Sequence, residues 1–91
     1  MARYRKSDQF ERRVSDDLEA LGTRWTVDLT AKKATGVEGY RLTLSYLEAD
    51  GSDAEFVQVD PADDRPEVEG RADALADDPG RLRELLREAR G

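Results

Sequence analysis

The first apolar positions of the chain recur with the spacing of an amphipathic helix. Across residues 7–21 the apolar side chains lie three or four positions apart, and charged residues fill the places between them. The apolar stripe consists of Phe10, Val14, Leu18 and Leu21. Ser7 or Asp8 suits the N-cap, and Gly22 suits the left-handed position that ends many helices. This segment therefore predicts an N-terminal helix.

The next three segments alternate between apolar and polar residues, as strands with one buried face do. Residues 24–32 alternate strictly, residues 40–46 repeat the pattern after a turn at 34–39, and residues 55–59 form a shorter apolar run after a turn at 49–54. Such runs separated by polar turns are typical of consecutive hairpins. We expect a three-stranded antiparallel meander.

The C-terminal third returns to helical spacing. Val68, Ala72 and Leu75 share a helical face, and residues 79–90 place leucines on one stripe after Asp78 as N-cap and Pro79 at the first helical position. The fold class predicted is α+β, in the order α-β-β-β-α with one or two C-terminal helices. We expect one domain over residues 1–91, with a flexible basic arm at 1–6 and a connector at 60–69.

In element order alone, residues 7–90 resemble the double-stranded RNA-binding domain. That family holds the RNA backbone with lysines at the start of its last helix and with a histidine in the loop between its first two strands. The corresponding places here are Asp77, Asp78 and residues 34–39, which contain neither. The resemblance therefore implies a topology and no RNA-binding residues.

Symmetrical closure of the two hairpins predicts their registers. In the first hairpin Leu29 faces Leu44 and Val27 faces Tyr46; in the second Tyr46 faces Val57. The opposite face of the sheet is then polar, except for Leu47 beside Phe56. These two residues are the predicted apolar contact patch, unless a terminal segment such as Tyr4 or the last helix covers them, or the third strand slips by one residue.

Composition removes several kinds of chemistry. The chain has no His and no Cys, so disulfides and thiolate zinc sites are excluded and the usual side chain for proton transfer near neutral pH is missing. The stretch 48–53 is rich in oxygen ligands, but an EF-hand register would put Tyr46 at the first ligand position. We expect no enzyme activity, no cofactor and no metal site. Without an apolar run of membrane-spanning length or a secretory signal, we expect a cytoplasmic protein.

Charge is distributed unevenly along the chain. The net charge is −6, and residues 48–78 hold twelve acids against Arg65 and Arg71. High acidity is also typical of a salt-adapted or high-GC background, which would give it no specific function. Otherwise acidic residues beside the patch would attract a basic partner. The predicted acidic rim consists of Asp50, Asp53, Asp60, Asp63 and Asp64.

Together these patterns predict a small acidic, non-catalytic protein-interaction module, such as an adaptor, inhibitor or chaperone-like protein. Self-association through the open sheet face or through a strand edge would use the same patch. The alternative is a nucleic-acid-binding module that uses the basic arm and the first hairpin. Its predicted contacts are Arg3, Arg5, Lys6, Lys32, Lys33 and Arg41.

Overall fold

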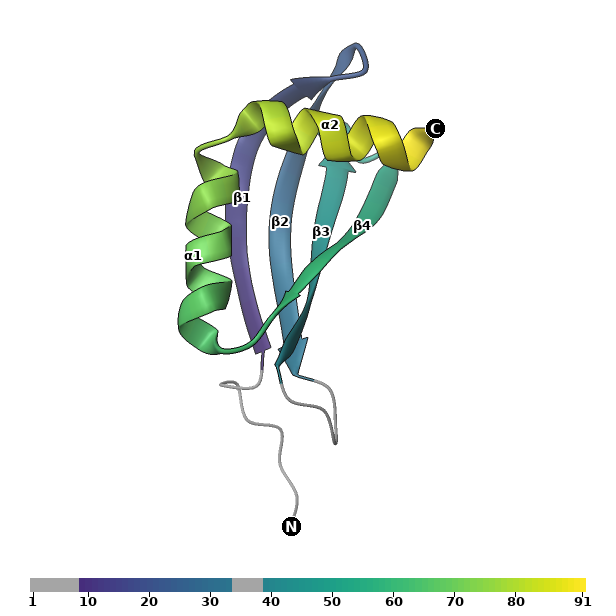
Figure 1. The fold of residues 1–91 in the computed structure, drawn as a ribbon. Helices are drawn as coiled ribbons and strands as arrows, with labels where there is room; N and C mark the ends of the chain where they lie inside the picture. The colour runs from purple at the N-terminus through teal and green to yellow at the C-terminus, as the bar shows by residue number, and fades with distance from the viewer. Residues whose placement is uncertain (1–8, 34–38) are drawn as a thin grey trace.

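The computed structural model describes residues 9–33 and 39–91, which form an antiparallel sheet followed by two helices (Figure 1). The elements in chain order are β1 (Gln9–Ala20), β2 (Thr23–Lys33), β3 (Tyr40–Glu48), β4 (Ala54–Ala62), α1 (Arg65–Ala76) and α2 (Pro79–Arg90). The fold is α+β, but the predicted order α-β-β-β-α is wrong. The observed order is β-β-β-β-α-α, so the topological resemblance to the double-stranded RNA-binding domain does not hold.

The segment predicted as the N-terminal helix is strand β1. A spacing of four residues fits a helix, but it also equals two full alternations of a strand. Phe10, Val14 and Leu18 are all buried on the inner face of the sheet, and Arg12 lies between the first two, half-buried at the rim. Two register shifts, one after Arg13 and one after Ser15, each add a residue to β1 and together keep the later side chains on the same face.

The turn from β1 to β2 explains why Leu21 and Gly22 were also assigned to the predicted N-terminal helix. Leu21 and Gly22 form a two-residue loop with φ values of 53° and 78°, and positive φ at both loop residues is the requirement of a type I′ hairpin turn. Gly22 therefore serves a hairpin and does not end a helix. Leu21, expected on the apolar stripe, is exposed at the tip of the turn.

The first predicted register is confirmed, and the second is displaced by two residues. Leu29 faces Leu44 as expected, but Tyr46 faces Glu55 and Val57 faces Leu44. Because side chains alternate with a period of two, a two-residue displacement changes the partners but not the faces. Val57 and Val59 therefore still point inward, and Phe56 still points outward.

Both helices begin at an aspartate cap followed by a proline. The Asp64 carboxylate accepts a hydrogen bond from the Glu67 N–H at 2.9 Å, and the Asp78 carboxylate accepts one from the Arg81 N–H at 3.1 Å. The predicted span of the last helix is confirmed. Residues 60–69, expected as a connector, instead supply the end of β4 and the beginning of α1, and only Asp63 and Asp64 lie between these elements.

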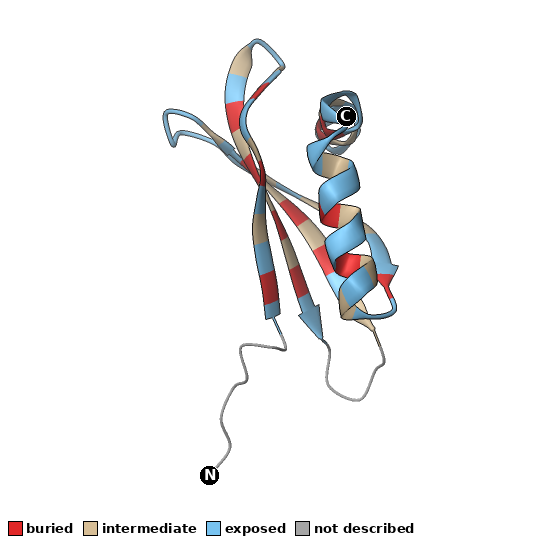
Figure 2. Ribbon diagram, turned by 90° about the vertical axis from the view of Figure 1, so that its left-hand side faces the viewer, coloured by how far each residue is buried: buried red, intermediate tan, exposed pale blue. Residues whose placement is uncertain are grey.

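Both helices pack on the same face of the sheet. α1 runs alongside β1, whereas α2 crosses the strands (Figure 1), and the view turned by 90° shows the helices together on one side (Figure 2). Val68 and Ala72 of α1 and Leu82 and Leu86 of α2 are fully buried against the inner face. The inner core residues of the strands include Trp25, Val27, Leu29, Leu42, Leu44 and Tyr46. Neither described helix lies on the outer face of the sheet.

Candidate protein-interaction surface

The outer face of the sheet is a platform of short polar side chains. Thr26, Thr30, Thr43 and Ser45 alternate with buried residues along β2 and β3, and each is half-buried by its neighbours. Asp28 joins them and pairs with Arg13 of β1 at 2.6 Å. That hydrogen bond, together with a second one to Asp16, raises the pKa of the Arg13 guanidinium. Arg13 thus pairs with both of these carboxylates at the β1 side of the face, and the rest of the face offers hydroxyl groups.

Leu47 and Phe56 interrupt this polar face. They are 50% and 67% exposed, the largest apolar exposures on the described part of the sheet. Leu47 faces Thr26 on one side and Ala54 on the other, while Phe56 faces Ser45. The direct Leu47–Phe56 pairing expected from the sequence is therefore replaced by a diagonal one, in which Cβ atoms lie roughly 7–8 Å apart. We call these two residues the outer patch.

No described element covers the outer patch. The last helix, one of the two segments that might have covered it, packs on the opposite face. Tyr4, the other, lies outside the described residues. Val57 and Val59, on the same strand as Phe56, face the core. Because side chains alternate along a strand, the Phe56 ring is held toward solvent.

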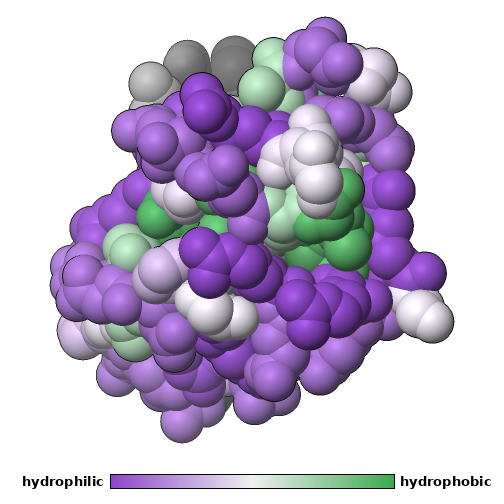
Figure 3. Space-filling model, turned by 90° about the horizontal axis from the view of Figure 1, so that it is seen from above, coloured by the Kyte–Doolittle hydropathy of each residue, from purple (hydrophilic) through white to green (hydrophobic). Residues whose placement is uncertain are grey.

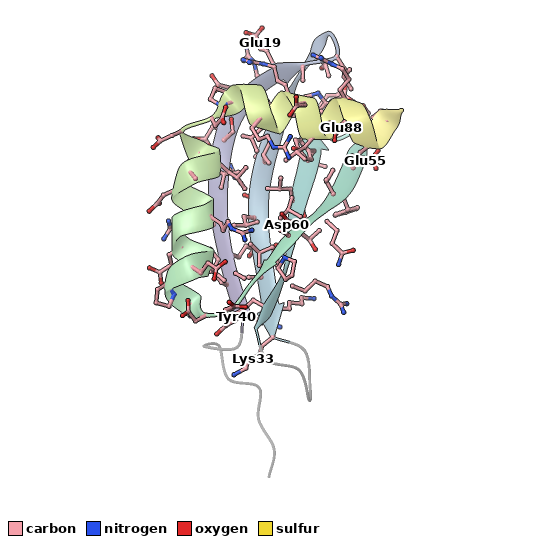
Figure 4. The ribbon with its side chains drawn as sticks, in the orientation of Figure 1. Glu19, Lys33, Tyr40, Glu55, Asp60 and Glu88 are labelled. Atoms are coloured by element: carbon pink, nitrogen blue, oxygen red, sulfur yellow. The ribbon has the colours of Figure 1, made fainter. Side chains whose placement is uncertain are left out.

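The five predicted rim carboxylates do not form one group. Asp50 and Asp53 lie in the turn before β4, whereas Asp63 and Asp64 lie after it. A nine-residue strand separates the two pairs by roughly 26 Å. Asp60, labelled in Figure 4, lies on the outward-facing register of β4 and shares the face of Phe56.

Three of these carboxylates also have structural partners. The Asp64 carboxylate caps α1. Arg90 donates to Asp53 at 2.7 Å, which holds the pKa of the Asp53 carboxyl below its ordinary value. The hydroxyl and the backbone N–H of Ser52 hydrogen-bond Asp50 and lower its pKa in the same direction. Of the predicted rim, Asp60 and Asp63 are the two whose carboxylates have no such role in the described structure.

The basic residues of the alternative prediction gather at the other end of the sheet. Lys32 and Arg41 face each other directly across β2 and β3, and Lys33 faces Tyr40. Lys33 and Tyr40 lie far from Glu19, at the opposite end of the strands (Figure 4). Arg3, Arg5 and Lys6 lie outside the described residues. Like charges placed directly opposite each other destabilise a sheet. Within the described residues neither Lys32 nor Arg41 has an ion pair, so this end of the sheet concentrates positive charge.

Arg90, in the last turn of α2, is a residue that the sequence analysis did not single out. Its guanidinium bonds Asp53 and lies 3.0 Å from the Glu55 carboxylate, and it stacks over the ring of Trp25 at 5.2 Å from the centroid. These contacts tie the last turn of α2 to the beginning of β4. In Figure 4, Glu55 lies just below the C-terminal half of α2.

An open hollow of about 700 Å³ lies beside the β1–β2 turn, and it was also missed. Arg24, Arg83 and Arg87 line it, and Arg83 is oriented by a 2.8 Å hydrogen bond to the Glu19 carbonyl. Three guanidinium groups around one hollow can hold an anionic group. Seen from above, toward the end that carries α2, hydrophilic side chains surround a limited apolar area (Figure 3).

The described residues contain no arrangement typical of a metal centre or of buried acid–base chemistry. No group of three or more His, Cys, Asp or Glu side chains within residues 9–33 and 39–91 is placed to hold a metal ion. All side chains buried in that part of the chain are hydrophobic, so no carboxylate there lies in a buried site of the kind that catalytic acids often occupy. None of the described helices has the length and apolarity needed to cross a membrane.

Comparisons with known proteins add no family to this picture. No family model matches the chain, and neither the curated proteins nor the solved structures include a significant match.

Proposed function

We propose that this protein is a non-catalytic protein-interaction module that binds a partner through the outer patch. The observation that carries the proposal is the exposure of Phe56, which is 67% accessible on a strand whose inward residues already complete the core. Aromatic side chains fixed on a rigid element are frequent anchors of interfaces. An exposed aromatic side chain lowers the solubility of the unbound protein and does not stabilise its core. A binding role accounts for its placement.

The charge near the patch favours a partner with a basic surface. Asp60 shares the outer face with Phe56, and the whole chain carries a net charge of −6. Complementary charge raises the association rate and selects among partners more than it adds affinity. The partner best matched to this surface has an apolar pocket or side chain flanked by Lys or Arg.

The test is affinity capture with three versions of the chain: wild type, Phe56→Asp and Gln58→Asp. Gln58 lies on the same strand and the same face, so Gln58→Asp introduces the same charge without removing the aromatic anchor. We expect a protein that is captured by wild type and Gln58→Asp, survives nuclease treatment and is lost with Phe56→Asp. Circular dichroism first establishes that all three chains are folded. Equal capture by Phe56→Asp, or unfolding of that variant, would contradict the proposal.

A second candidate function, nucleic-acid binding, is favoured by the Lys32–Arg41 pair. These side chains face each other directly and share the outer face with hydroxyl-bearing residues. Phosphate contacts would neutralise the repulsion between the two cations.

This candidate predicts a binding affinity for a single-stranded oligonucleotide that falls steeply with salt concentration. The double change Lys32→Gln with Arg41→Gln should reduce both the affinity and its salt dependence. The control is Arg12→Gln with Arg81→Gln, which also removes two positive charges but from arginines that already pair with Asp73 and Glu84. A binding curve that does not respond to salt, or an equal loss in the control, would eliminate this candidate.

A further inference from the structure

The sheet has two edges, and they differ in how they are protected. The strand order β1-β2-β3-β4 leaves β1 and β4 with one described neighbour each. β1 carries two register shifts and a cluster of paired charges around Arg13, both of which discourage strand addition. β4 has one proline, Pro61, and one register shift, and both lie beyond Val59. Residues 54–59 of β4 contain no proline, lysine or register shift. We propose that two copies of this chain pair through this edge, in antiparallel fashion, to form one continuous sheet.

The direction of the backbone groups follows from one hydrogen bond. The Glu48 N–H donates to the Asp53 carbonyl at 2.9 Å, so this pair belongs to the hydrogen-bonded set of the β3–β4 ladder. In an antiparallel ladder such pairs alternate with non-hydrogen-bonded ones. Glu55, Val57 and Val59 therefore direct their N–H and C=O groups toward β3, and Phe56 and Gln58 direct theirs toward the open edge.

The two ends of the open edge are already occupied by side chains. The Asp53 carboxylate accepts from the Ala54 N–H at 2.8 Å. Arg71 donates to the Asp60 carbonyl at 2.8 Å and to the Pro61 carbonyl at 3.2 Å. Between these capped positions lie Phe56 and Gln58. In the described edge, they are the residues that have both their N–H and their C=O group available for a new strand.

Those two residues complement each other about a two-fold axis. If the axis passes through Val57, Phe56 of each copy lies opposite Gln58 of the other, and their four outward backbone groups make four reciprocal hydrogen bonds. The available stretch is short and capped at both ends, and the same stretch of a second copy matches it in length, direction and backbone groups. For this reason we assign the edge to a second copy of the chain.

Charge and side-chain contacts agree with this register. Glu55 comes to lie opposite Val59 of the second copy, and Ala54 opposite its Asp60, so no like charges are directly opposed. The two Phe56 side chains become diagonal neighbours on the outer face. The two outer patches then join into one apolar strip of four side chains, Leu47 and Phe56 from each copy. This pairing is independent of the proposed partner binding, which requires only the patch.

The first test changes one backbone donor. Gln58→Pro removes the N–H that points away from β3, so it should leave the β3–β4 ladder intact. Gln58→Thr keeps that N–H and is the matched control. In sedimentation equilibrium over a wide range of protein concentration, we expect wild type and Gln58→Thr to dimerise, and Gln58→Pro to dimerise at least about tenfold more weakly. A wild type that stays monomeric at every concentration, or a dimer unaffected by the proline, would overturn the proposal.

A second test does not depend on the fold tolerating proline. The chain has no native cysteine, and Val57 would face itself in a non-hydrogen-bonded pair with Cα atoms about 4.5 Å apart, a separation at which a disulfide can close. With oxidised glutathione, Val57→Cys should form a covalent dimer much faster than Thr43→Cys, which lies on the central strand β3. Equal rates for the two variants would place any dimer contact elsewhere. If Phe56→Asp no longer captures a partner while Val57→Cys still cross-links, partner binding and the pairing of two copies are distinct properties.

Discussion

At the scale of single residues, Tyr46 links the core to the pH dependence of stability. Its hydroxyl donates to the Leu82 carbonyl at 2.8 Å within the core, and burial raises its pKa to about 12, against a smaller opposing effect of Arg81. The unfolded chain loses this proton near pH 10. The folded chain keeps it, so the free energy of unfolding should be unaffected below pH 10 and fall as the pH rises toward 12.

The variant Tyr46→Phe isolates this effect. It should cost about 1 kcal/mol at neutral pH, because the hydrogen bond to Leu82 is lost, and it should weaken the alkaline decline. Urea unfolding followed by the fluorescence of Trp25, the single tryptophan, measures both quantities between pH 7 and the alkaline range. An alkaline decline that is as steep in Tyr46→Phe as in wild type would assign it to other groups.

Leu21 adopts a backbone conformation that a leucine side chain disfavours. Its φ of 53° lies in the left-handed region, and its side chain is 51% exposed in the β1–β2 turn. Asparagine tolerates this region far better, and Asn-Gly is a preferred sequence for a type I′ turn. Leu21→Asn should therefore stabilise the protein by about 1 kcal/mol. Thermal unfolding checks this, with Leu47→Asn, in an ordinary strand, as the control that should not be stabilised.

At the scale of elements, Arg90 fastens the end of α2 to the sheet. It combines two partly exposed ion pairs with stacking on Trp25. Contacts of this kind at an exposed site are screened by solvent and each contributes little, so their effect depends on their acting together. Arg90→Ala should lower the free energy of unfolding and alter the emission of Trp25. Arg87→Ala removes an equal charge from the same helix turn and should change neither by as much; equal effects would reduce the role of Arg90 to the helix dipole.

The elements that the sequence predicted correctly are those whose signals have a single interpretation. The strict alternation of β2 and β3 and the Asp-Pro start of α2 fit only one structure each. The four-residue spacing of Phe10, Val14 and Leu18 fits two, and the choice between them depends on β2, which offers an edge to pair with. Gly22 likewise suits either a helix end or a hairpin turn.

The sequence predicted those features of the candidate site that follow from the alternation of side chains along a strand. Leu47 and Phe56 were assigned to the outer face by alternation, which survived the two-residue displacement of the register. The role of Asp53 as a partner of Arg90 depends on the folded arrangement of distant segments. The Asp64 cap is local, but it was missed because residues 60–69 were expected to form a connector. The open edge of β4 could not be inferred while β1 was taken for a helix, because the edges follow from the strand order.

At the scale of the whole molecule, net charge distinguishes the modes of association. Two copies that each carry −6 repel one another, and salt screens that repulsion. The dimerisation constant should therefore strengthen as salt concentration rises, while capture of a basic partner or of a nucleic acid should weaken. Sedimentation equilibrium at low and high salt measures the first effect. Dimerisation that weakens with salt would indicate an interface held by ion pairs, in contrast to the backbone pairing of β4.

The placement of both helices after all four strands has a consequence for synthesis. At most six residues separate each strand from the next, so the sheet can assemble hairpin by hairpin as the chain leaves the ribosome. The cover of its inner face, however, is complete only when Leu82 and Leu86 have been made. A chain truncated before Pro79 would present an apolar sheet to the cell, and such a fragment would be a target for chaperones and proteases.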